Sequence, residues 1–126
     1  MTSEHRTPRY AVLVVEDEPL LRMHAVDIVE DAGFVAIEAR DADEAIAILE
    51  KRADVTLLFT DIQMPGSMDG LKLAHAVRDR WPPIKIVVVS GQMQLTQNDL
   101  PANSRFFSKP FHAEKMIKEL QALFES

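Results

Sequence analysis

The sequence contains no cysteine and no long apolar run. The absence of cysteine excludes a disulfide scaffold, a thiolate nucleophile, and a zinc or iron–sulfur site with cysteine ligands. No apolar stretch approaches the roughly 20 residues that span a bilayer. Residues 1–9 also lack the apolar segment of a signal peptide. We therefore expect a cytoplasmic protein that has no membrane segment.

Positive charge is in deficit. The chain has 14 Lys and Arg residues against 20 Asp and Glu residues, a formal net charge of −6. An acidic domain binds phosphate backbones poorly, which argues against direct nucleic-acid binding as the main activity. With 126 residues, 47% of them hydrophobic, the composition predicts one globular domain. We expect residues 1–9, which are polar and include Pro8, to be a disordered lead to a domain over 10–126.

Short apolar runs alternate with longer amphipathic stretches along the chain. The runs are 11–15, 34–38, 55–60, 84–89 and 105–108. Several are rich in Val, Ile and Leu without polar alternation, which is typical of strands buried on both faces of a parallel sheet. Helical spacing with start and stop signals predicts helices over about 19–32, 41–49, 69–81 and 113–124. The alternation predicts an α/β fold, with an open parallel sheet covered by helices on both faces.

The stretch 92–104, between the last two predicted strands, is a weak helix candidate. Its large apolar side chains are only Met93, Leu95 and Leu100, and Pro101 interrupts it. We therefore expect a fourth helix that is short or irregular, in a region that is itself mobile or irregular.

Chemically reactive side chains follow four of the five predicted strands. Glu16 and Asp17 come after the first strand, Asp61 after the third, Ser90 after the fourth and Lys109 after the fifth. The carboxyl ends of parallel strands share one edge of the sheet, so we expect these groups to converge there. Two carboxylates about 4 Å apart repel by roughly 4 kcal/mol at an effective dielectric of 20, so the cluster needs a counter-charge. Lys109 and a Mg²⁺ ion would supply it, and such a site can accept a phosphoryl group.

Several short motifs in a fixed order carry a family resemblance. They are Val14-Val15-Glu16-Asp17-Glu18-Pro19, Thr60-Asp61-Ile62-Gln63-Met64-Pro65, Met68-Asp69-Gly70, Val89-Ser90-Gly91 and Ser108-Lys109-Pro110-Phe111. The chain resembles the receiver domain of two-component response regulators, the group that includes CheY. This resemblance implies a flavodoxin-like, doubly wound, five-stranded parallel sheet with strand order 2-1-3-4-5.

The resemblance also implies a role for particular side chains. Asp61 falls on the phosphoacceptor, Ser90 on the hydroxyl that bonds the phosphoryl group, and Lys109 on the ammonium group that contacts it. Phe106 falls on the aromatic switch position. The Lys109–Pro110 bond is a candidate for the cis form, although sequence alone favours trans.

A magnesium site is implied in the same way. Glu16 and Asp17 fall on the acidic pair that holds Mg²⁺, Asp61 is a further ligand, and Gln63 falls where a backbone carbonyl completes the metal shell. The implied activity is that of a stand-alone receiver, a signalling switch rather than an enzyme. It takes a phosphoryl group from the phosphohistidine of a sensor histidine kinase or a phosphotransfer protein, and it then remodels a surface that binds an unknown protein target.

Two other interpretations stay open at this point. A phosphatase of the haloacid dehalogenase type also uses an Asp nucleophile and Mg²⁺, but it normally has a second acid where Gln63 stands. A receiver-like scaffold that takes no phosphoryl group is the other alternative, although the complete set of acidic, hydroxyl and lysine residues argues against it.

Overall fold

The computed structural model describes residues 10–64, 66, 68–91 and 97–125, so the predicted lead over 1–9 lies outside the described residues. The strands are β1 (Ala11–Val15), β2 (Val35–Ala39), β3 (Val55–Asp61), β4 (Lys85–Ser90) and β5 (Ser104–Ser108). The helices are α1 (Pro19–Asp31), α2 (Ala42–Lys51), α3 (Gly70–Arg80) and α4 (Ala113–Ala122). The helix α4 therefore stands at the place of the fifth helix of the expected fold. No helix in the described ranges is long and apolar enough to cross a membrane.

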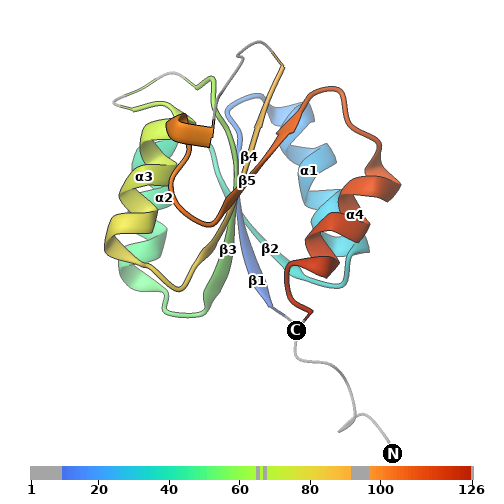
Figure 1. The fold of residues 1–126 in the computed structure, drawn as a ribbon, viewed down its shortest axis with the longest axis horizontal. Helices are drawn as coiled ribbons and strands as arrows, with labels where there is room; N and C mark the ends of the chain where they lie inside the picture. Colours follow the sequence, from blue (N-terminus) through green and yellow to red (C-terminus); the bar gives the residue numbers. More distant parts are fainter. Residues whose placement is uncertain (1–9, 65, 67, 92–96, 126) are drawn as a thin grey trace, which may run out of the picture.

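All five strands are parallel and their order is β2-β1-β3-β4-β5. The predicted fold class is confirmed. Figure 1 shows the sheet between two helical layers, with α2 and α3 on one face and α1 and α4 on the other. Because the strands run the same way, the carboxyl ends of β1, β3, β4 and β5 open toward a common edge.

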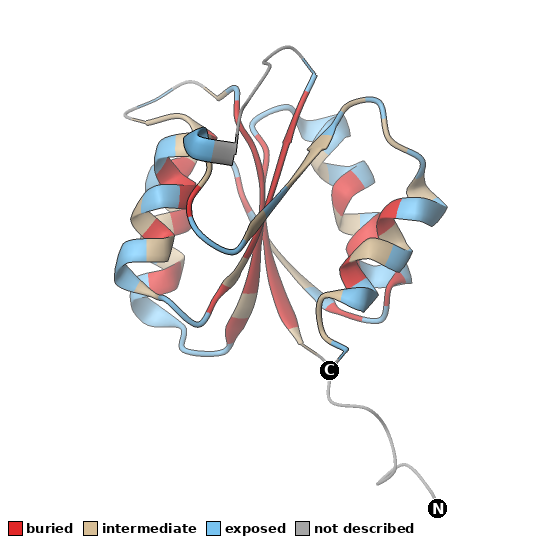
Figure 2. Cartoon of the chain, viewed as in Figure 1, coloured by how far each residue is buried: buried red, intermediate tan, exposed pale blue. Residues whose placement is uncertain are grey.

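The central strands supply side chains to two apolar cores, one under each helical layer. The α2–α3 core includes Leu13, Leu58, Leu73, Val77, Ile86 and Val88. The α1–α4 core includes Val12, Val14, Ile28, Leu57, Val87 and Leu120. Neighbouring residues of one strand thus enter opposite cores, as the period of two in a strand requires. Figure 2 shows the buried positions concentrated on the strands and on the helix faces that meet them.

Local signals set the start of two helices and one chain reversal. The Asp41 carboxylate accepts a hydrogen bond from the backbone N–H of Glu44, and Asp69 caps α3 through the N–H of Lys72, both at 2.9 Å. Gly33, just after α1, has φ of 98°, a conformation that glycine adopts without steric cost. These caps fix where each helix leaves the edge of the sheet.

The connection between β4 and β5 contains the 3₁₀ helix η2 (Gln97–Asp99). No α-helix occurs among residues 97–103, which agrees with the expected short or irregular fourth helix. The rest of that prediction, over 92–96, lies outside the described residues. The segment is attached to α3, since His75 Nε2 lies 2.8 Å from the Asp99 carbonyl oxygen. Arg78 also donates hydrogen bonds to the carbonyls of Ala102 and Asn103.

Candidate functional site

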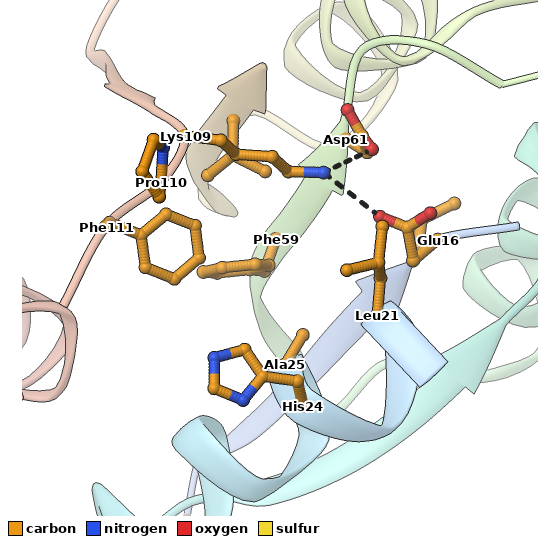
Figure 3. A pocket seen from close by; sticks show the side chains of 11 residues that line it. Glu16, Leu21, His24, Ala25, Phe59, Asp61, Lys109, Pro110 and Phe111 are labelled. Carbon is orange, nitrogen blue, oxygen red and sulfur yellow. Dashed lines mark hydrogen bonds and ion pairs between the residues drawn. The ribbon is translucent and has the colours of Figure 1, made fainter. Parts of the chain in front are cut away.

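Three charged side chains from three strand ends meet at the carboxyl edge of the sheet. The ammonium group of Lys109 donates a hydrogen bond to Asp61 Oδ2 at 2.7 Å and lies 3.5 Å from Glu16 Oε1. Figure 3 shows the lysine extending across the site from the loop after β5 to reach both acids. Glu16 and Asp61 are only 5% and 6% exposed. The predicted convergence of Glu16, Asp61 and Lys109 thus appears in the structure.

The two buried carboxyl groups, those of Glu16 and Asp61, share the positive charge of one ammonium group, that of Lys109. The pKa of Glu16 is raised from 4.5 to about 7. Burial is the largest cause, and a hydrogen bond with Asp61 and the Asp61 charge add to it, against the N–H of Glu18 and the charge of Lys109. Burial would lower the pKa of Lys109, yet its hydrogen bond to Asp61 and the two acidic charges raise that pKa above its usual value. The Glu16 carboxyl group therefore favours an added proton or an added cation beside it.

The backbone around Asp61 is closely fitted. Its carbonyl oxygen accepts a hydrogen bond from the Thr60 hydroxyl at 2.9 Å, and the backbone N–H of Gln63 reaches Asp61 Oδ1 at 3.3 Å. A side chain at Gly70 would overlap the Asp61 carbonyl oxygen, so α3 can approach this closely only with glycine there. Gly70 was part of the family motif, but nothing in the sequence alone gave a reason for it at that position.

The other predicted residues lie around this centre in different settings. Asp17 is exposed and makes no hydrogen bond or ion pair with any other part of the described chain. Ser90, at the end of β4, is 1% exposed. Phe106 is partly buried and packs against the α2–α3 core. The Lys109–Pro110 peptide bond is cis.

Sequence reasoning missed Arg22, a residue of α1. Its Nη1 donates to the Glu16 carbonyl oxygen at 2.9 Å, and its Nε donates to Glu38 Oε1 at 3.1 Å. The Arg22 side chain is 17% exposed, against 56% for Glu38. No local pattern reveals this contact, because the glutamate partner stands on β2, far along the sequence. From its spacing alone, Arg22 is predicted to lie on the polar face of an amphipathic helix.

A cavity of about 420 Å³ opens beside the charged centre. Its walls come from α1, from the strand ends and from the loop after β5, and the lining residues are Val15, Glu16, Leu21, His24, Ala25, Phe59, Asp61, Val89, Lys109, Pro110 and Phe111. The rings of Phe59 and Phe111 meet edge to face with centroids 6.5 Å apart. Figure 3 shows the exposed His24 at the rim of this space. The cavity gives an incoming group access to Asp61.

The donor atoms suit a hard divalent cation. Among the described residues, no group of three or more His, Asp or Glu side chains is arranged to hold a metal ion. Two buried carboxylates do meet, those of Glu16 and Asp61, and they are opposed by a single ammonium group. Mg²⁺ binds through one or two carboxylates and retains several waters, so these residues fit it without a third acid.

The sheet order and the helical layers define a doubly wound α/β domain. Its candidate site is the acidic centre at the carboxyl edge of the sheet. The sequence model of the response regulator receiver domain matches residues 12–121. The chain therefore belongs to the response regulator receiver domain family, the CheY-like signalling switches of two-component systems.

Relatives of known name agree with this assignment. The chain is 35% identical over 111 residues to the nitrogen assimilation regulatory protein NtrX of Azorhizobium caulinodans, covering 84% of this chain and 24% of that protein. It is 30% identical to the response regulator receiver protein CpdR of Brucella abortus, covering 89% of this chain and 94% of that protein. The chain thus spans about a quarter of the length of NtrX.

A solved structure gives the same result for the fold. A response regulator receiver protein from Sinorhizobium medicae superposes with a TM-score of 0.84 at 27% identity, covering 91% of this chain and 94% of that one.

Proposed function

We propose that Asp61 accepts a phosphoryl group from the phosphohistidine of a sensor histidine kinase or phosphotransfer protein, in a reaction that depends on Mg²⁺. The observation that carries this proposal is the buried Asp61 carboxylate, held 2.7 Å from the Lys109 ammonium group at the mouth of an open cavity. A carboxylate in this setting is a nucleophile with charge compensation already in place.

The proposed step forms one bond and breaks one. A carboxylate oxygen of Asp61 attacks phosphorus, and the bond from phosphorus to the donor imidazole nitrogen breaks. The electron pair goes to that nitrogen, and the product is an aspartyl phosphate. The ammonium group of Lys109 is hydrogen-bonded to Asp61. It can therefore also stabilise the negative charge on the phosphoryl oxygens. The Ser90 hydroxyl is the proposed further donor to the same group.

Glu16, Asp17, Asp61 and the Gln63 carbonyl are the groups that would hold Mg²⁺. When bound, the ion would neutralise the charge that develops on the transferred phosphoryl oxygens. The raised pKa of Glu16 supports this assignment, because a buried acid pair with one nearby lysine favours a further positive charge.

The proposed output is a change of surface. A phosphoryl group adds about −1.5 to −2 charges and three acceptor oxygens, which draw Ser90 and Lys109 toward Asp61. Phe106 lies on the edge strand β5, opposite Val88 of β4, and packs against the α2–α3 core. A change of its rotamer would alter the surface that β5 forms with the segment at the place of the fourth helix and with α4, which stands at the place of the fifth. A protein target reads that face in this proposal.

The experiment is phosphorylation by a small acyl-phosphate donor, followed by intact mass with and without Mg²⁺. We expect a single adduct that needs Mg²⁺, is labile in base and is absent in Asp61→Asn. The matched variant Asp79→Asn changes an exposed acid on α3 and should behave as wild type. No adduct under any condition would indicate a scaffold, and turnover of unrelated phosphomonoesters would indicate a phosphatase.

A further inference from the structure

The loop between β1 and α1 carries the acidic residues of the site, and its backbone is held from outside the site. Arg22 donates to the Glu16 carbonyl oxygen at 2.9 Å. That carbonyl belongs to the peptide unit between Glu16 and Asp17, so its direction sets the plane from which the Asp17 side chain departs. Asp17 itself is exposed and makes no contact that orients it within the described residues.

Arg22 is in turn held by a second contact. Its Nε donates to Glu38 Oε1 at 3.1 Å, near the end of the neighbouring strand β2. The guanidinium is therefore held at two of its nitrogen atoms, Nη1 and Nε. The side chain is only 17% exposed, so the surrounding chain covers most of it. A planar guanidinium holds two acceptors in a set geometry, which a lysine ammonium group cannot reproduce.

From this geometry we propose that Arg22 is a positioning residue for the Mg²⁺ site. It acts through the Glu16–Asp17 peptide, and Glu38 holds it in place. The effect of Arg22 on Mg²⁺ affinity rests on the proposed function, whereas its effect on the conformation of the loop does not. Outer contacts of this kind orient groups that bind a metal without touching the ion, and they commonly change metal affinity by a factor of 10 or more.

The sign of the effect separates this proposal from simple electrostatics. Arg22 carries a positive charge close to an acidic site, so removing the charge alone should make Mg²⁺ bind more tightly, by about twofold. Removing a positioning contact should make Mg²⁺ bind more weakly. Arg22→Gln therefore gives opposite results under the two explanations.

The test uses amide NMR spectra of the full chain, with hydrogen exchange measured without metal and Mg²⁺ affinity measured by titration. In Arg22→Gln we expect faster exchange at the amides of Glu16 and Glu18, which bond to the Ala39 carbonyl and the Glu16 carboxylate, and Mg²⁺ binding that is weaker by roughly tenfold. Arg22→Lys keeps the charge and should still weaken binding, by a smaller factor. Glu38→Gln should also speed exchange, because it releases Arg22.

The matched control is Arg52→Gln, which removes the same charge from an exposed pair with Asp54 and should leave both measurements unchanged. Unchanged exchange in Arg22→Gln, or Mg²⁺ binding as tight as in wild type or tighter, overturns the proposal. If wild type itself binds no Mg²⁺ while exchange at Glu16 and Glu18 accelerates in Arg22→Gln, the metal part of the proposed function fails and the positioning of the loop stands.

Discussion

Glu16 holds a proton more tightly in the folded chain than in the unfolded one, because burial, followed by the contact with Asp61, raises its pKa from 4.5 to about 7. The folded state therefore binds more protons between these pH values, and the free energy of unfolding falls as pH rises through that window. The loss is at most about 3–4 kcal/mol, since each pKa unit corresponds to about 1.4 kcal/mol. Above about pH 7 the contribution of Glu16 becomes constant.

Urea unfolding without metal at several pH values between 4.5 and 8 checks this prediction. Glu16→Gln should gain stability relative to wild type as pH rises, because the variant has no charge to bury. The exposed Glu114→Gln on α4 is the matched control and should follow wild type at every pH. Parallel stability curves for wild type and Glu16→Gln would contradict the prediction.

A second prediction concerns Gly70, where the neighbouring backbone leaves no room for a side chain. A methyl group there would overlap the Asp61 carbonyl oxygen and lie 2.9 Å from Ile62 Cα, both backbone atoms that cannot turn away. Gly70→Ala should lower the free energy of unfolding by more than about 2 kcal/mol, as overpacking against a rigid neighbour does. Gly33→Ala meets no atom within 4 Å, and its positive φ costs only about 1 kcal/mol. Equal losses in the two variants, measured by urea unfolding, would show that α3 can shift.

Among the structural elements, the connection after β4 is held to α3 by Arg78 as well as by His75. Arg78 of α3 donates to the carbonyls of Pro82 and Ile84, in the turn that follows the helix. It also donates to the carbonyls of Ala102 and Asn103 before β5. One guanidinium therefore joins α3 to the segment that stands where the fourth helix is expected.

Arg78→Met should cost about 2 kcal/mol of stability, because it leaves four carbonyl groups without their charged donor. Hydrogen exchange should also accelerate in residues 97–104. The matched control is Arg80→Met, two residues later on the same helix, which removes a surface pair with Glu50 and should cost less than about 1 kcal/mol. If the two variants lose the same stability and show the same hydrogen exchange, the hydrogen bonds of Arg78 do not stabilise the segment.

Elements marked by local chemistry were predictable from the sequence. The helix starting at Asp41 and the helix starting near Asp69 were placed correctly, since a cap bonds within three residues of itself. The strand predicted over 55–60 extends to Asp61, a boundary difference of one residue. Of the site, the meeting of Glu16, Asp61 and Lys109 followed from parallel strands alone, because it requires only that their ends share an edge.

Contacts between distant segments were not predictable in this way. Arg22 and Glu38 are 16 residues apart, and Arg78 and Ala102 are 24 apart. An arginine on a helix surface has the same sequence pattern whether it faces water or reaches a carbonyl on another element. The sequence gives no indication of how exposed Asp17 is, since the rule about strand ends locates a residue and does not orient its side chain.

Over the whole molecule, the sheet joins the two cores into one structure. Leu57 enters the α1–α4 core and Leu58 the α2–α3 core, although they are neighbours in β3, and Val87 and Val88 do the same in β4. Neither helical layer can detach without exposing one face of strands that the other layer still needs. This arrangement favours a single cooperative unfolding transition for the whole domain.

Trp81, the single tryptophan, gives a direct test because it packs against the α2–α3 core. Leu120 lies in the α1–α4 core on the opposite face and is fully buried, so Leu120→Ala should cost about 2–5 kcal/mol. If the cores unfold together, this distant change shifts the transition seen by Trp81 fluorescence as far as the one seen by far-ultraviolet circular dichroism. Leu73→Ala, in the core that Trp81 reports, is the matched variant and should also move both probes together. A Trp81 transition that stays at its wild-type midpoint in Leu120→Ala, while the circular dichroism shifts, would mean that the two layers unfold separately.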